Sequence, residues 1–152
     1  MQRLVIGSLL GVLLSLPLAM APARADQLIT PAEAALPSPP DSGLTLRGIT
    51  RGPAIEQVEP SADAKGVSSP VKLKVLFSAR NNATIDTGSV KVTYIKTPAV
   101  DLSARLKPHI TPDGIDLKDA EVPPGTHLIR IDLKDSQGRA STALIKLSVK
   151  DK

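Results

Sequence analysis

The stretch VKLKVLFS at residues 71–78 decides the fold class of this chain. Its odd-numbered residues are apolar, and its even-numbered residues are polar apart from Leu76. Successive side chains of an extended strand point to opposite faces, so this alternation separates an apolar face from a polar one. We therefore predict a β-strand here, with one face in an apolar core and the other toward water.

The same period of two recurs along the chain. Turn-forming residues separate the alternating runs: Asn81-Asn82, Pro123-Pro124-Gly125, and Asp135 to Gly138, where Gly138 suits the left-handed position of a four-residue hairpin loop. Six or seven short strands, each with one apolar face, predict an all-β sandwich of about seven strands. The predicted strands are 55–59, 71–78, 90–95, 115–122, 127–133 and 143–149.

One segment, residues 101–108, departs from the alternation. Asp101 is a suitable helix N-cap, and Leu102 and Leu106 are spaced i, i+4, which places them on one face of a helix. Pro108 would end such a helix. The segment therefore predicts one or two helical turns between two strands, with an irregular loop as the alternative.

The first 25 residues have the pattern of a secretory signal peptide. Arg3 supplies the positive start, residues 4–20 form an apolar run, and Ala23-Arg24-Ala25 matches the small-x-small cleavage pattern. We therefore expect cleavage before Asp26 and a periplasmic or secreted mature protein. A membrane anchor is the alternative, although a run of about 17 residues containing Pro17 is short for a spanning helix.

Between the signal peptide and the strands, residues 26–53 resemble a linker. Five prolines interrupt the segment, and such a composition favours an extended spacer, with a short edge strand at 44–46 as an addition. The predicted organisation is a signal peptide at 1–25, a proline-rich linker at 26–53 and one domain at 54–152. The chain has no cysteine, so this domain must fold on its apolar core without disulfides.

Two stretches resemble parts of bacterial immunoglobulin-like domains. EPSADAKGV at residues 59–67, followed by the strand at 71–77, is similar to the opening of such a domain. PPGTH at 123–127, followed by the last two predicted strands, is similar to the closing hairpin. The likeness covers residues 54–150 and implies a sandwich of the fibronectin or cadherin type, without the Cys and Trp core of antibody domains. Such folds serve as spacers, adhesion modules and accessory domains of enzymes.

Composition argues against several functional classes. Without the signal peptide the net charge is +2, the basic residues are scattered, and Phe77 and Tyr94 are the only aromatic residues. A nucleic-acid-binding surface needs a basic face with aromatic stacking platforms. Both aromatic residues lie at apolar positions of predicted strands, where we expect the core to bury them. We therefore expect no nucleic-acid partner.

Metal-binding and catalytic patterns are also weak. His109 and His127 are the only histidines, and a periplasmic copper or zinc site needs a cluster of imidazoles or thiolates. We expect His127 to be a hydrogen-bonded core residue and His109 to be exposed. The acids Asp113, Asp116, Asp119 and Glu121 lack the loop spacing of an EF-hand. The sequence has no Gly-x-Ser-x-Gly elbow and no phosphate-binding glycine loop, so we expect no enzyme, cofactor or metal.

Four apolar residues fall on the outward side of predicted strands. Several such residues on one sheet form a patch, and patches mark contact sites, whereas single ones are ordinary. The alternative is that the segment with Leu102, Leu106 and Ile110 covers them. We predict a non-enzymatic binding or structural module that contacts a protein or cell-envelope partner; a small periplasmic metal-binding or carrier protein is the alternative. The predicted contact residues are Leu76, Ile95, Leu128 and Leu144.

Overall fold

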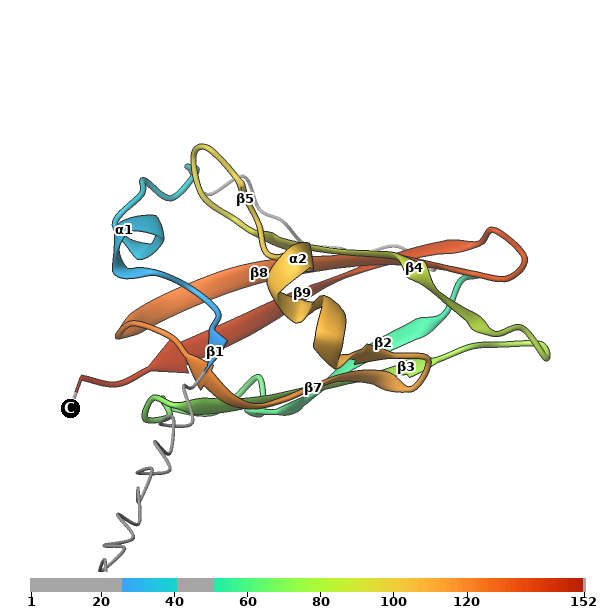
Figure 1. The fold of residues 1–152 in the computed structure, drawn as a ribbon, viewed down its shortest axis with the longest axis horizontal. Helices are drawn as coiled ribbons and strands as arrows, with labels where there is room; N and C mark the ends of the chain where they lie inside the picture. The colour runs from blue at the N-terminus through green and yellow to red at the C-terminus, as the bar shows by residue number, and fades with distance from the viewer. Residues whose placement is uncertain (1–25, 41–50, 152) are drawn as a thin grey trace, which may run out of the picture.

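The computed structural model describes residues 26–40 and 51–151, so the predicted signal peptide at 1–25 and the predicted edge strand at 44–46 lie outside the described residues. Within this range the chain forms nine strands, two short α-helices and one 3-10 helix. The strands build two sheets that pack face to face (Figure 1). The predicted all-β architecture of two packed sheets is therefore confirmed.

The first layer, sheet A, has the strand order β1-β7-β3-β2, and β6 pairs with β7 as a short hairpin. β1 runs parallel to β7, while the other neighbours are antiparallel. The strands of this sheet are β1 (Asp26–Gln27), β2 (Ala54–Glu59), β3 (Val71–Ser78), β6 (Ile110–Thr111) and β7 (Gly114–Glu121).

The second layer, sheet B, is antiparallel throughout, with the order β5-β4-β8-β9. β4 begins five residues before the predicted strand at 90–95. Its pairing register with β8 shifts between Asp86 and Lys91. Such a bulge breaks the alternation, which hides the first half of the strand from sequence patterns. The strands are β4 (Ile85–Tyr94), β5 (Val100–Asp101), β8 (Gly125–Asp135) and β9 (Ala140–Val149).

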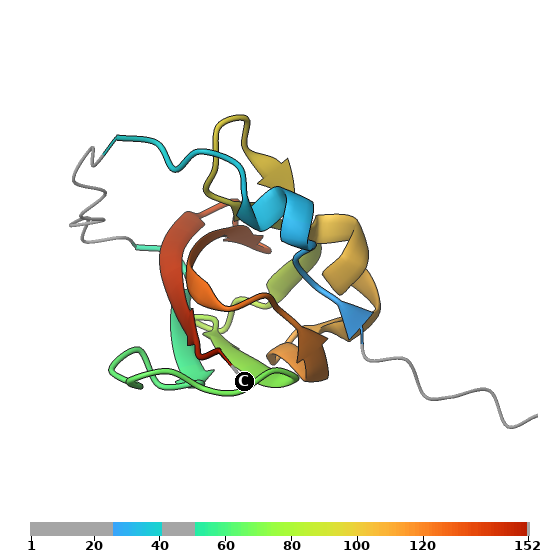
Figure 2. The same ribbon diagram turned by 90° about the vertical axis from the view of Figure 1, so that its left-hand side faces the viewer.

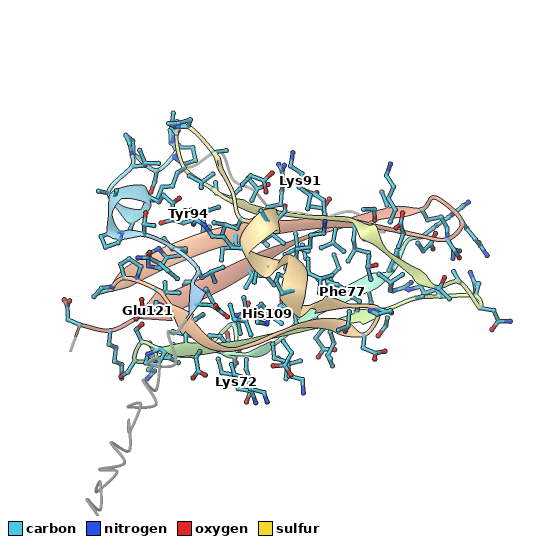
Figure 3. All side chains as sticks on the ribbon, in the orientation of Figure 1. Lys72, Phe77, Lys91, Tyr94, His109 and Glu121 are labelled. Carbon is cyan, nitrogen blue, oxygen red and sulfur yellow. The ribbon has the colours of Figure 1, made fainter. Side chains whose placement is uncertain are left out.

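The inner faces of the two sheets form the core. Both aromatic residues are buried as predicted, and Phe77 lies between the layers in Figure 3. The predicted inner residues of the last hairpin are at most 2% exposed. Full burial of such a side chain stabilises the fold by roughly 1.5–3 kcal/mol relative to leaving it in water. These hairpin residues are Ile129, Ile131, Ile145 and Leu147.

The predicted helical segment lies between the layers on one open side of the sandwich (Figure 1). It consists of α2 (Ser103–Leu106) and the 3-10 helix η1 (Lys107–His109). The carboxylate of Asp101 accepts a hydrogen bond from the backbone N–H of Ser103 at 2.8 Å. Leu102 and Leu106 are fully buried in the core. They therefore do not cover the outward-facing leucines, and that alternative is wrong.

Residues 26–38, here called the N-terminal strap, are not the free spacer that the proline content predicts. Leu28 and Ile29 are 1% exposed and belong to the core, and β1 pairs with β7. The strap then forms α1 (Pro31–Ala34) and crosses the end of the sandwich from sheet A to sheet B (Figure 2). Pro31 stands in the first helical turn, where the missing N–H costs nothing, so this proline does not mark a linker.

The outer edge of β9 is covered along much of its length. The Gln57 side chain accepts a hydrogen bond from the Lys146 backbone N–H at 3.2 Å and donates one to the Lys146 carbonyl at 3.0 Å. Further along, Val67 donates to Ser148 at 2.8 Å and accepts from Lys150 at 2.9 Å. These bonds occupy groups that would otherwise offer an open edge for another strand.

Candidate functional site

The four predicted contact residues do not share one surface. Leu76 lies in β3 of sheet A and is 38% exposed, whereas Leu128 lies in β8 of sheet B and is 39% exposed. Ile95 and Leu144 are half-buried and belong to sheet B's side of the molecule. Alternation shows that a residue points outward but not which sheet its strand joins. The prediction of one patch with four members is therefore wrong for Leu76.

The other three residues form a diagonal line across adjacent strands. The backbone N–H of Ile95 donates to the carbonyl of Leu128 at 2.9 Å, directly beyond the end of β4. In the pairing of β8 with β9, Leu128 stands opposite Lys146. Two residues further along β8, Arg130 stands opposite Leu144, so the two leucines are diagonal neighbours on one face. We call Ile95, Leu128 and Leu144 the apolar stripe.

Cationic side chains border the apolar stripe. Arg130 donates to Asp132 at 2.9 Å, and the other oxygen of Asp132 accepts from the Thr142 hydroxyl at 2.6 Å. Lys146 is exposed and forms no ion pair with any residue that the structure describes, whereas Lys91 stands opposite Asp132 and acts on the carboxylate of Asp101. Lys91 lies above sheet B in Figure 3. The border of the stripe is therefore positively charged on balance.

The outer face of sheet A has a different character. Leu76 stands opposite Glu56 of β2 and Gly114 of β7. Four residues along β3, Lys72 forms an exposed ion pair with Glu59 at 2.6 Å and lies below sheet A in Figure 3. No large apolar side chain stands directly opposite Leu76, but Val58 on the neighbouring strand β2 is also exposed, at 37%.

His127 is a buried, hydrogen-bonded core residue, as predicted. It is 2% exposed, its Nε2 lies 2.8 Å from the carbonyl oxygen of Pro123, and its Nδ1 lies 2.8 Å from the hydroxyl of Tyr94. A carbonyl has no proton to give, so Nε2–H must donate to Pro123 and Nδ1 must accept from Tyr94. Burial lowers the pKa of this imidazole below its ordinary value, and the nearby charge of Lys96 lowers it further.

His109 is less exposed than expected. Its side chain is 28% exposed, and its Nε2 lies 3.0 Å from a carboxylate oxygen of Asp26 in the N-terminal strap. The four acids considered for calcium, at 113, 116, 119 and 121, are all exposed. Across residues 26–40 and 51–151, no three His, Cys, Asp or Glu side chains are grouped to hold a metal ion.

The strap is held by charged side chains that composition did not single out. Glu33 receives two hydrogen bonds from the Arg105 guanidinium of α2, at 2.8 and 2.6 Å. This guanidinium lowers the pKa of Glu33 from 4.5 to about 2. Glu33 also completes a capping box with Thr30, whose hydroxyl accepts from the Glu33 N–H at 3.2 Å. The pattern Thr-x-x-Glu at residues 30–33 is the sequence signal that could have indicated this helix start.

The chain matches no family model, no curated protein and no solved structure. Among the residues that the structure describes, no helix is long and apolar enough to cross a membrane.

Proposed function

We propose that this chain is an exported, immunoglobulin-like binding module that performs no catalysis and contacts a protein partner through the outer face of sheet B. The observation that carries this proposal is the apolar stripe, in which three apolar side chains gather on neighbouring strands. Exposed apolar groups that cluster in this way mark contact sites more strongly than scattered ones.

The strand order supports the immunoglobulin-like assignment. In an immunoglobulin constant domain one sheet has strands A, B, E and D, and the other has C, F and G. The order β2-β3-β7-β6 corresponds to A-B-E-D, and β4-β8-β9 corresponds to C-F-G. β5 beside β4 and β1 beside β7 are additions to this plan.

The charge around the stripe favours a partner with acidic groups. Lys146 stands opposite Leu128, and Arg130 stands opposite Leu144. A complementary surface would place apolar side chains over the stripe and carboxylates around them, because opposite charges at an interface rim speed association and select the partner. A relatively flat sheet face suits another protein surface, whereas small ligands bind in concave pockets.

Export is supported by the signal-peptide pattern of residues 1–25. N-terminal sequencing of the protein from the cell-envelope fraction should give a start at or within a few residues of Asp26. An intact Met1 in membrane-bound protein would contradict cleavage and make the apolar run an anchor.

Two matched substitutions test the contact surface. Leu128→Lys and Leu76→Lys place the same charge at positions of nearly equal exposure on opposite sheets. In affinity capture from envelope extracts, the wild type and Leu76→Lys should retain the same protein, and Leu128→Lys should lose it. Both variants should melt within a degree or two of the wild type, since neither side chain is buried. Equal capture by Leu128→Lys would contradict the proposal.

A further inference from the structure

A chain of contacts joins the buried His127 to the N-terminal strap. The Nδ1 atom of His127 meets the Tyr94 hydroxyl at 2.8 Å. The ammonium of Lys96 lies 5.5 Å from the centroid of the Tyr94 ring. The same ammonium donates to the carbonyls of Ala34 at 3.0 Å and Leu36 at 2.9 Å. Figure 3 shows Tyr94 next to α1, so this chain of contacts runs from the core to the strap.

Every hydrogen-bonding group here has a partner only when the imidazole is neutral. Nε2–H donates to Pro123, and the lone pair of Nδ1 accepts the hydroxyl proton of Tyr94. A second proton on Nδ1 would remove that acceptor. Tyr94 is fully buried, and its hydroxyl has no other acceptor among the residues that the structure describes, so its proton would lose its partner.

The surroundings of the ring offer no compensating negative charge. Lys96 acts on the imidazole with a like charge. Glu33 of α1 acts on Tyr94, but Arg105 already pairs with both of its carboxylate oxygens. The other neighbours of the ring are apolar or uncharged: Leu147 opposite His127 on β9, Pro123 in the turn before β8, and Gly125 at the start of β8.

The charged groups beyond Pro123 line a solvent-open groove. They are Glu121, Lys150 and Asp151, and all three are exposed. Water therefore screens them from the ring. An imidazolium at position 127 would therefore face a Tyr94 hydroxyl whose proton has no acceptor, with the like charge of Lys96 acting on the ring.

Few backbone hydrogen bonds attach the strap near this site. β8 pairs with β9 at ten positions, whereas β1 pairs with β7 at two. On the sheet B side, the strap is held by Lys96 and by one backbone bond of 2.9 Å from Thr97 to Pro37. We propose that His127 makes the attachment of the strap sensitive to acid: when its imidazole gains a proton, residues 31–38 detach from the Lys96 side chain while the two sheets stay folded. This proposal is independent of the contact surface on sheet B.

Hydrogen exchange of the full chain tests whether protonation of His127 detaches the strap, with exchange rates corrected for the intrinsic effect of pH. In the wild type, protection of the amides at 33–36 should fall by about tenfold for each pH unit between the ordinary pKa of histidine, about 6.5, and the lower folded pKa of His127, and should level off below it. Protection in β3 and β8 should stay unchanged over the same range. His127→Gln keeps a neutral side chain at every pH, so its strap protection should not vary with pH above 4.5, where the Glu33–Arg105 ion pair is fully formed.

Two further results decide the proposal even if His127→Gln does not fold. The imidazole of wild-type His127, followed by NMR, should titrate with the same midpoint as the loss of strap protection. Titration of His127 without any change in the strap would overturn the proposal. A parallel loss of protection in β3 and β8 would also overturn it, because acid would then unfold the whole domain.

Discussion

Leu76 and Leu128 have nearly the same exposed fraction, 38% and 39%, but their surroundings differ. Leu76 stands on sheet A opposite Glu56, and Val58 on the same neighbouring strand is a second exposed apolar residue. Leu128 stands on sheet B between Ile95 and Leu144, with Lys146 opposite. Exposure alone therefore does not identify a contact surface. What distinguishes the two leucines is strand register, which decides the residues that lie beside each of them.

The largest expected effect lies on the inner faces, where the two sheets should behave alike. Leu73→Ala in sheet A and Ile131→Ala in sheet B each remove a side chain that is at most 2% exposed. Each should lower the free energy of unfolding by about 2–5 kcal/mol through lost burial and a residual cavity, as measured by urea titration. If Leu128→Ala cost as much, the outer face of sheet B would be covered and the contrast with Leu76 would be broken.

Acid should weaken the strap, which joins the edges of the two sheets. The folded-state pKa of Glu33, about 2, lies below its unfolded value of 4.5. The stabilisation by Glu33 is therefore complete above pH 4.5 and lost as the pH falls from 4.5 toward 2. Glu33→Gln should cost about 2 kcal/mol at pH 7, allowing for solvent around Arg105, and the difference from wild type should shrink below pH 4.5. Urea titrations at pH 7, 4 and 3 measure this, and a difference independent of pH would contradict the ion pair.

The hydrogen bonds between the Gln57 side chain and the Lys146 backbone cover part of the outer edge of β9. Removing them tests how much this cover contributes to the stability of sheet B. Gln57→Ala removes the two hydrogen bonds to the Lys146 backbone. We expect a loss of about 1 kcal/mol, together with more self-association in analytical ultracentrifugation, because the β9 edge becomes available. Glu56→Ala, the adjacent outward residue, is the control and should change neither quantity. An unchanged free energy of unfolding in Gln57→Ala would mean that water replaces both hydrogen bonds of the Gln57 side chain to Lys146.

The smallest effects are expected at the two exposed leucines themselves. Leu76→Ser and Leu128→Ser should each change the free energy of unfolding by less than about 0.5 kcal/mol, because neither side chain is buried. Thermal unfolding of both variants side by side measures the difference. A clearly larger loss for Leu128→Ser would show that the stripe stabilises the fold of the isolated chain, which would weaken its assignment as a partner surface.

Local patterns were sufficient for much of the fold. The period of two located the main strands, and Gly138 takes the left-handed conformation predicted for the hairpin loop, with φ of 76°. The i, i+4 spacing of Leu102 and Leu106 indicated the helical segment. The apolar position of His127 predicted its burial. Each of these features depends on neighbours within a few residues in the chain, which is why the sequence reveals them.

Tertiary structure alone decided the strap and the stripe. Leu28 and Ile29 join the core because β1 pairs with a strand more than 90 residues later, at Ala120 and Glu121. Leu76 separates from Leu128 because their strands enter different sheets. Alternation determines whether a side chain points inward or outward, since that follows from backbone geometry. It does not determine which strands become neighbours, because pairing is selected by the packing of the whole core.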